Sequence, residues 1–146
     1  EAFASLDQRM VTFYEGALWM HEEGSIANYY GLFQAPQIQI AHSEEGTEFN
    51  PVEIQIIADK RWNVPLVSMP IDGYHTAGQV SKIPDLKNFN GTWKGSFLRD
   101  QNDTSFPSGE RLRRGRKLWG TVLLVTLETD IFSRLLTVKV NATKRQ

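Results

Sequence analysis

The sequence predicts a mainly β fold of the α+β class: an antiparallel β-sandwich or OB-like barrel of about six or seven strands, with an amphipathic helix at its N-terminus. Three observations favour this class. Short runs of alternating apolar and polar residues recur from residue 37 onwards. Turn-forming Gly, Pro, Asn and Asp residues separate these runs. In residues 1–24, apolar residues instead recur at spacings of three and four, which is the period of a helix.

Residues 1–24 are predicted to form this helix. Its apolar stripe consists of Phe3, Leu6, Met10, Phe13, Ala17 and Met20. We expect the stripe to pack against the sheet or against a neighbouring chain. Gly24 is a suitable C-terminal stop, with His21 in the last turn. Gly16 weakens the helix, however, and VTFYEGALWM at 11–20 would also fit a pair of strands.

Two strictly alternating runs begin a β-rich body that we place at residues 37–140. They are QIQIAH at 37–42 and VEIQII at 52–57, each with one apolar face. In the second run that face carries Val52, Ile54 and Ile56. One apolar face is typical of half-buried strands. The polar, acidic residues 43–48 between the runs predict an antiparallel hairpin with a long loop.

A short strand is predicted at residues 64–69. Pro65 and Pro70 bound it. Because Pro cannot donate to a strand ladder, we expect this strand at a sheet edge. Residues 71–90 show no regular pattern.

The next predicted strand covers residues 91–99, GTWKGSFLR. Its apolar face carries Trp93, Gly95 and Phe97. A glycine on this face indicates either a bulge or a close approach of another backbone segment.

The most informative stretch is Ser108–Leu127. Five of its residues are cationic within seven positions: Arg111, Arg113, Arg114, Arg116 and Lys117. The run 118–127 follows without a break, and because it is apolar on both faces it predicts a central strand. A further strand is predicted at 131–140. A basic loop is therefore expected at the end of a core strand, and loops held on rigid scaffolds commonly carry binding functions.

The whole chain, residues 1–146, fits one globular domain. Hydrophobic residues make up 40% and charged residues 23%, which is typical of a folded protein. The chain has no cysteine, which excludes a disulfide framework, a Cys-ligated zinc site and thiol catalysis. Neither a signal peptide nor a transmembrane segment is recognisable, so we expect a soluble chain, in a compartment that the sequence leaves open.

The net charge of −1 conceals an asymmetry along the chain. Residues 1–90 contain 5 Lys/Arg and 12 Asp/Glu, whereas residues 91–146 contain 11 and 5. Such asymmetry indicates an interaction face for a polyanion, or acidic and basic faces that meet between copies of the chain. Alternatively, the two halves interleave in the fold and the asymmetry disappears.

Catalytic and cofactor motifs are absent from the sequence. The three histidines, His21, His42 and His75, do not have the spacing of metal ligands. No phosphate-binding, dinucleotide or nucleophile-elbow motif occurs. We therefore expect a non-enzymatic binding module without a metal or cofactor.

Single-stranded nucleic acid is the partner that the basic stretch favours. Arginine binds phosphate through two hydrogen bonds at once, and aromatic rings stack on unpaired bases. The predicted binding residues are Arg111, Arg113, Arg114, Arg116, Lys117, Lys94, Arg99, Trp93 and Trp119. The two tryptophans would also suit the core.

Two alternatives remain open. The chain would also suit a structural subunit of a larger assembly, such as a virion, tail or secretion component. In that case the basic loop would bind an acidic protein partner, for which residues 43–48 of a neighbouring copy are a candidate, giving a homo-oligomer. The second alternative is a ligand-binding barrel or an enzyme whose pocket contains Tyr74, His75 and the aromatic residues of 25–36.

Overall fold

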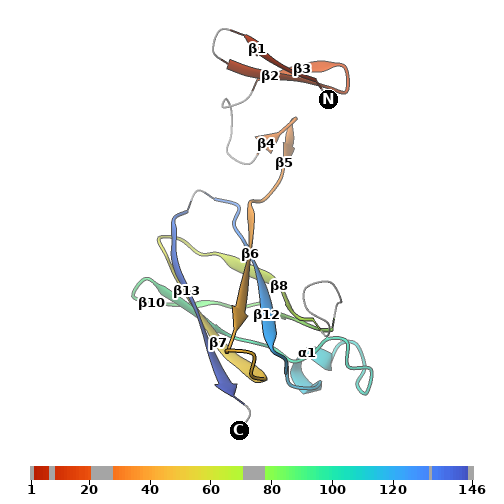
Figure 1. Cartoon of the computed structure of the whole chain (residues 1–146), viewed down its shortest axis with the longest axis vertical. Helices are drawn as coiled ribbons and strands as arrows, with labels where there is room; N and C mark the ends of the chain where they lie inside the picture. Colours follow the sequence, from red (N-terminus) through yellow and green to blue (C-terminus); the bar gives the residue numbers. More distant parts are fainter. Residues whose placement is uncertain (1, 7–8, 21–27, 71–77, 132, 145–146) are drawn as a thin grey trace. The chain divides into compact units, whose positions relative to one another are not determined.

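The computed structural model describes residues 2–6, 9–20, 28–70, 78–131 and 133–144. The elements are β1 (Ala2–Leu6), β2 (Arg9–Tyr14), β3 (Ala17–Met20), β4 (Asn28–Tyr29), β5 (Leu32–Phe33), β6 (Gln37–Ser43), β7 (Phe49–Ala58), β8 (Asn63–Met69), β9 (Gln79–Ile83), β10 (Lys87–Phe89), β11 (Thr92–Ser96), α1 (Arg111–Arg114), β12 (Val122–Glu128) and β13 (Leu135–Lys144) (Figure 1). The chain is mainly β with antiparallel sheets, as predicted. It divides into two compact units, Glu1–Pro36 and Gln37–Gln146, here called the N-terminal unit and the body.

The predicted N-terminal helix is wrong. The residues described there form β1, β2 and β3, paired in that order in an antiparallel sheet. Glu15 and Gly16 join β2 to β3 with φ angles of 49° and 77°. Two successive residues with positive φ make a type I′ turn, which reverses the chain into a tight hairpin. The supposed helical stripe therefore falls on paired strands, where Phe13 lies opposite Leu18.

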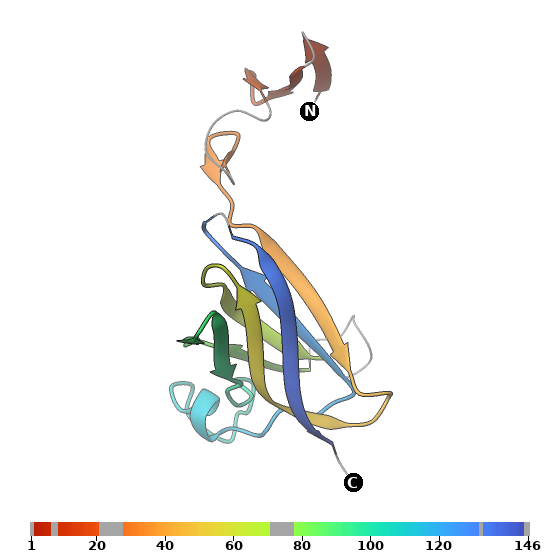
Figure 2. The ribbon, with the colours of Figure 1, turned by 90° about the vertical axis from the view of Figure 1, so that its left-hand side faces the viewer.

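The body consists of two four-stranded antiparallel sheets (Figure 2). Their strand orders are β10-β11-β7-β13 and β6-β12-β8-β9. The hairpin predicted from residues 37–42 and 52–57 is wrong, because β6 and β7 belong to different sheets. β6 pairs instead with β12, and β7 with β13. Alternation identifies a strand but not its partner, and here both partners lie far along the chain.

Both sheets contribute to one apolar core. Among its fully buried members are Ile54 and Ile56 of β7 and Leu123, Val125 and Leu127 of β12. Burying each such side chain contributes about 1.5–3 kcal/mol. β12 lies between β6 and β8, which confirms the predicted central strand. Val52 is 49% exposed rather than inward-facing, because the β7–β13 register shifts beside it.

β8 contains residues 64–69, but it lies between β12 and β9, so the predicted edge position is wrong. Pro65 is tolerated there because the β8–β9 register is irregular between Val64 and Val67. β9 and β10 occupy a stretch where the sequence shows no regular pattern. Over the part of the chain that the structure describes, no helix is long and apolar enough to cross a membrane.

We expect Gly95→Ala to destabilise the body. A Cβ at this position would lie 2.6 Å from Cγ2 of Ile83 and 2.9 Å from the carbonyl oxygen of Asp85, so the close backbone approach predicted for Gly95 is confirmed. Overpacking of this kind costs about 1–3 kcal/mol, measurable by urea unfolding. The control is Gly109→Ala, where an added Cβ meets no atom within 4 Å. It should stay within about 0.5 kcal/mol of the wild type, and equal losses in both variants would contradict the packing argument.

Candidate nucleic-acid interface

A long connection carries the chain from β11 in one sheet to β12 in the other. This crossing segment, residues 97–121, contains α1 and the whole predicted basic loop. Its backbone is tied to β9, since the N–H of Gln101 donates to the carbonyl of Val80 at 2.8 Å. It is also tied to itself, since the N–H of Arg99 donates to the carbonyl of Leu112 at 2.8 Å. The basic loop is therefore fixed to the body at several points.

Asp100 is one of two buried carboxylates that hold the crossing segment. Its side chain is 2% exposed. Oδ1 accepts hydrogen bonds from the backbone N–H of Val80 at 3.1 Å and of Asn102 at 3.0 Å. Backbone N–H donors replace the water that a buried carboxylate loses. Asp100 thereby fixes the start of the segment to β9.

Asp103 fixes the segment to itself. Oδ1 accepts from the N–H of Ser105 at 3.0 Å, and Oδ2 accepts from the N–H of Arg116 at 2.8 Å. The hydrogen bonds from Ser105, followed by the backbone and charge of Arg116, hold the pKa of Asp103 below its usual value. The residue before Arg116 has to be Gly115, because a Cβ at position 115 would lie 2.5 Å from the carbonyl oxygen of Arg111.

The guanidinium groups of Arg111 and Arg114 contact the loop itself. Nε of Arg111 donates to the carbonyl of Phe106 at 2.9 Å. Nη1 of Arg114 donates to Oε2 of Glu110 at 2.7 Å, and its Cζ lies 5.1 Å from the centre of the Phe106 ring. Arg113, by contrast, is exposed and has no ion pair with any residue that the structure describes. Arg111 and Arg114 therefore stabilise the shape of the loop, although the side chain of Arg114 remains 64% exposed.

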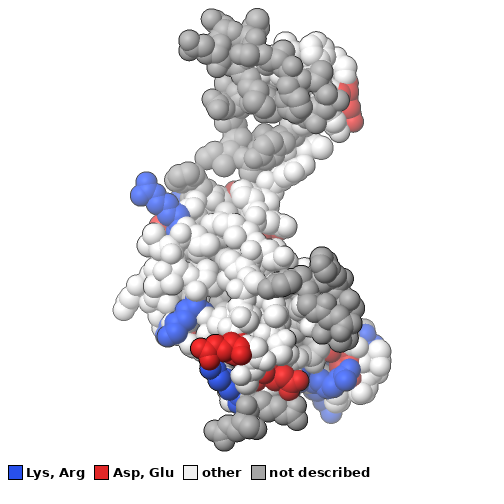
Figure 3. Space-filling view, viewed as in Figure 1, with Lys and Arg blue, Asp and Glu red and all other residues white. Residues whose placement is uncertain are grey.

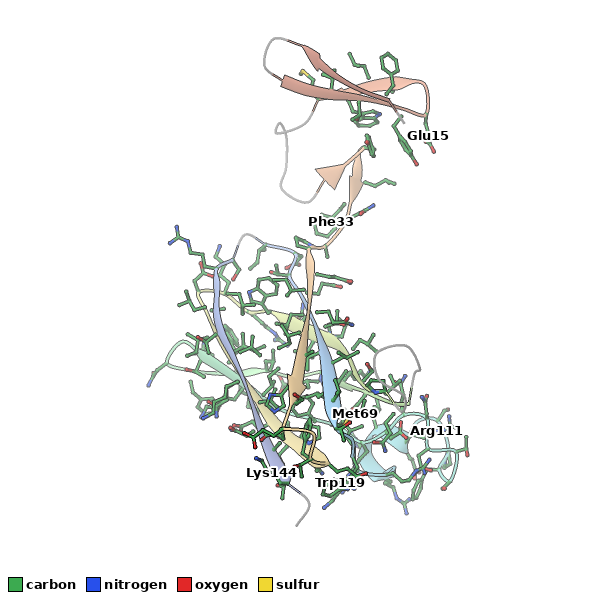
Figure 4. The ribbon with its side chains drawn as sticks, viewed as in Figure 1. Glu15, Phe33, Met69, Arg111, Trp119 and Lys144 are labelled. Atoms are coloured by element: carbon green, nitrogen blue, oxygen red, sulfur yellow. The ribbon has the colours of Figure 1, made fainter. Side chains whose placement is uncertain are left out.

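Arg99, Lys117 and Trp119 line one cleft, which we call the tryptophan cleft. Its volume is about 360 Å³. Trp119 is 40% exposed, so one face of its indole is accessible. Figure 4 shows Trp119 and Arg111 at the same end of the body, where β13 finishes with Lys144. Three of the nine predicted binding residues therefore come together here.

Gln79 of β9 positions this cleft, and no sequence pattern distinguishes it. Its Nε2 donates to the carbonyl of Lys117 at 3.0 Å, and its Oε1 accepts from the N–H of Trp119 at 2.7 Å. Leu118, between these two residues, is only 2% exposed. Successive side chains of an extended chain alternate in direction. With Leu118 buried, Lys117 and Trp119 are directed outwards.

A second cleft adjoins the first along β11, and we call it the lysine cleft. Its volume is about 520 Å³, and its lining includes Lys87, Phe89 and Lys94. Ser96 and Leu98 line both clefts, so the two are adjacent. Lys87 lies directly opposite Lys94 in the β10–β11 pair, and Nζ of Lys94 lies 5.6 Å from the centre of the Phe89 ring. Sequence reasoning missed Lys87 and Phe89.

The outer face of this sheet carries charges of both signs. Lys139 of β13 continues the lysine row, because it pairs with Gln55, which pairs with Lys94. Glu53 and Asp85, however, also line the lysine cleft. On the face of the body drawn in Figure 3, Lys and Arg atoms likewise lie beside Asp and Glu atoms. The body therefore presents cations along a path, not as one continuous basic surface.

Trp93 lies on the other face of β11. It packs against the core, and its indole nitrogen is buried with no hydrogen-bond partner among the described residues. Lys94, the next residue, is directed to the outer face. The exposed aromatic side chain of the lysine cleft is instead Phe89, which is 55% exposed.

The histidines and the residues of the alternative ligand pocket form no metal site among the described residues. Within the described ranges, no group of three or more His, Asp or Glu residues can hold a metal ion. Nε2 of His42 lies 3.0 Å from Oε1 of Glu44, whose Oε2 lies 2.9 Å from Nζ of Lys144. His21, Tyr74 and His75 lie outside the described residues.

Comparison with known proteins assigns no family. No protein-family model matches the chain, and no curated protein matches its sequence. The functional conclusion therefore depends on the two clefts.

Acid is expected to weaken the crossing segment through Asp103. Its pKa is lower in the folded chain than in the unfolded chain. The resulting stabilisation is complete above the unfolded pKa of about 4, and it is lost as the pH falls through the folded pKa. We expect the urea midpoint to fall between about pH 5 and pH 2, and to fall less in Asp103→Asn.

Ser105→Ala removes the side-chain hydroxyl that hydrogen-bonds to Asp103 but keeps the backbone N–H, so it should give an intermediate pH dependence. Thr104→Ala, at the exposed neighbouring position, is the matched control and should follow the wild type. If Asp103→Asn keeps the full pH dependence, the carboxylate does not stabilise the segment in the way inferred.

Proposed function

We propose that the body is a β-sandwich module that binds single-stranded nucleic acid without catalysing a reaction. One observation carries this proposal: two adjacent clefts along β11 bring four cations together with two exposed aromatic rings. The cations are Lys87, Lys94, Arg99 and Lys117, and the rings are those of Phe89 and Trp119.

This arrangement suits the chemistry of a single strand. Phosphates repeat along the strand, and cations spaced along the clefts would neutralise several of them. Unpaired bases expose their ring faces, and accessible aromatic side chains offer surfaces on which they stack. In a duplex these ring faces are already stacked on neighbouring base pairs. An exposed ring in each cleft therefore favours a single strand over a duplex.

The proposal divides the predicted binding residues between base stacking, phosphate binding and support of the loop. We assign stacking to Trp119 and Phe89 and not to Trp93, because Trp93 packs against the core. Phosphate binding falls to the cations of the clefts. Arg111 and Arg114 maintain the shape of the loop through Phe106. Exposed Arg113 then adds to the positive potential near the tryptophan cleft.

Binding of a labelled single-stranded oligonucleotide, followed by fluorescence anisotropy at several salt concentrations, tests this assignment. If all four cleft cations contact phosphate, the slope of log K against log salt should be about −3. The double variant Lys94→Ala/Lys117→Ala should reduce the slope to about −1.4, because each contact contributes about −0.7. The double variant Lys60→Ala/Arg61→Ala removes two exposed cations outside the clefts and should keep the full slope.

Trp119→Ala separates stacking from charge. It should weaken binding by about 1–3 kcal/mol while leaving the salt slope unchanged, since no phosphate contact is removed. Absence of binding by the wild type at low salt would exclude the proposal. So would equal losses in the cleft and control double variants.

A further inference from the structure

The small sheet of the N-terminal unit has one covered face. Tyr30, from the turn between β4 and β5, packs on it. Its ring stacks on that of Tyr14 at 4.4 Å between centroids and meets that of Trp19 edge-on at 5.6 Å. Oγ1 of Thr12 donates to its hydroxyl at 3.1 Å. These contacts cover one face of the sheet.

The opposite face is apolar and partly exposed. Phe13, Leu18 and Met20 share it by register and are 55%, 54% and 46% exposed, whereas Val11, opposite Met20 on the same face, is buried. β3, with the sequence ALWM, is an edge strand without charge or proline. Natural sheets usually protect an exposed edge with such residues, and an unprotected apolar edge is prone to pair with another chain. This face therefore has the properties of an interaction surface.

The body has a complementary apolar seam. β6 and β13 are edge strands of the two sheets, and a cleft of about 350 Å³ lies between them. Its lining includes Ile40 of β6 together with Leu136 and Val138 of β13. Leu136 is 71% exposed, and Ile38 nearby on β6 is 41% exposed. A seam between two free edges accepts an added strand through both backbone pairing and apolar contacts.

Net charge distinguishes the N-terminal unit from the body. Residues 1–36 contain five acidic residues and one arginine, a net charge of −4, which leaves +3 on residues 37–146 from the total of −1. Arg134, directly before β13, and Lys139, within β13, are exposed. Glu15, labelled in Figure 4, is exposed at the β2–β3 turn. Opposite net charges favour association and set its orientation.

We propose that the apolar face of the N-terminal unit of one copy docks in the β6–β13 seam of a second copy. The contact joins different surfaces, so it is head-to-tail, and the proposal does not rest on nucleic-acid binding. The N-terminal unit is a better partner for the basic body than the acidic loop 43–48. Glu44 of that loop already pairs with Lys144 and lies beside His42 within the same chain.

Sedimentation velocity of the full chain, freed of nucleic acid, tests the proposal with two single variants. Leu18→Lys changes the N-terminal face, and Leu136→Lys changes the seam. Each would bury an unpaired charge in the contact, so we expect the dissociation constant to rise by about tenfold or more. Leu66→Lys changes another exposed apolar residue, on β8, which is 44% exposed, and should associate like the wild type.

Mixing the two variants gives the decisive result. Each variant alone lacks one half of every contact, but the mixture pairs the intact N-terminal face of Leu136→Lys with the intact seam of Leu18→Lys. Recovery of a dimer in the mixture supports the head-to-tail contact. For a contact with a micromolar dissociation constant, the wild type should be associated at a protein concentration about 100 times that constant. A wild type that stays monomeric at this concentration would overturn the proposal, as would a mixture that stays monomeric. Phe13→Ser replaces Leu18→Lys if circular dichroism shows that the latter is unfolded.

Discussion

The proposed binding surface depends on the hydrogen bonds that Asp100 and Asp103 accept inside the crossing segment. Residues 97–121 connect the two sheets without forming a strand, so their backbone groups need partners outside a sheet ladder. The two buried carboxylates bind backbone N–H groups of β9 and of the segment itself. Arg99 precedes Asp100, and Lys117 follows the residue that Asp103 binds. The carboxylates therefore determine where two cations of the tryptophan cleft lie.

These contacts also explain why we do not assign phosphate binding to every arginine of the basic run. A guanidinium that spans a loop and meets a carbonyl, a carboxylate or a ring stabilises that loop. Arg111, Arg114 and Arg116 all do so to some degree; Nε of Arg116 lies 3.8 Å from Oδ2 of Asp103. The cations that line the two clefts are Lys87 of β10, Lys94 of β11, and Arg99 and Lys117 of the crossing segment. Of these four, the sequence prediction included Lys94, Arg99 and Lys117.

The sequence predicted those features that depend on local pattern. Alternation identified β6 and β7, a short run bounded by prolines identified β8, and the two apolar faces of the run 118–127 placed β12 centrally. Strand partners depend on contacts far along the chain, so the supposed β6–β7 hairpin was wrong. The helix was wrong because apolar spacings of three and four also arise on a hairpin with a two-residue turn, for which Glu15-Gly16 was the available signal. In the site, Gln79, Lys87 and Phe89 were missed because their strands are short and lack an alternating pattern.

The two proposed surfaces occupy different parts of the same body. The clefts follow β11 and the crossing segment, whereas the seam follows β6 and β13, and the two share no lining residue. Docking at the seam would therefore leave the clefts accessible. It would also place the negative N-terminal unit of one copy against the positive body of the next, which removes the repulsion between neighbouring bodies. Head-to-tail copies would then present successive clefts to one strand, and binding of one copy would favour binding of the next.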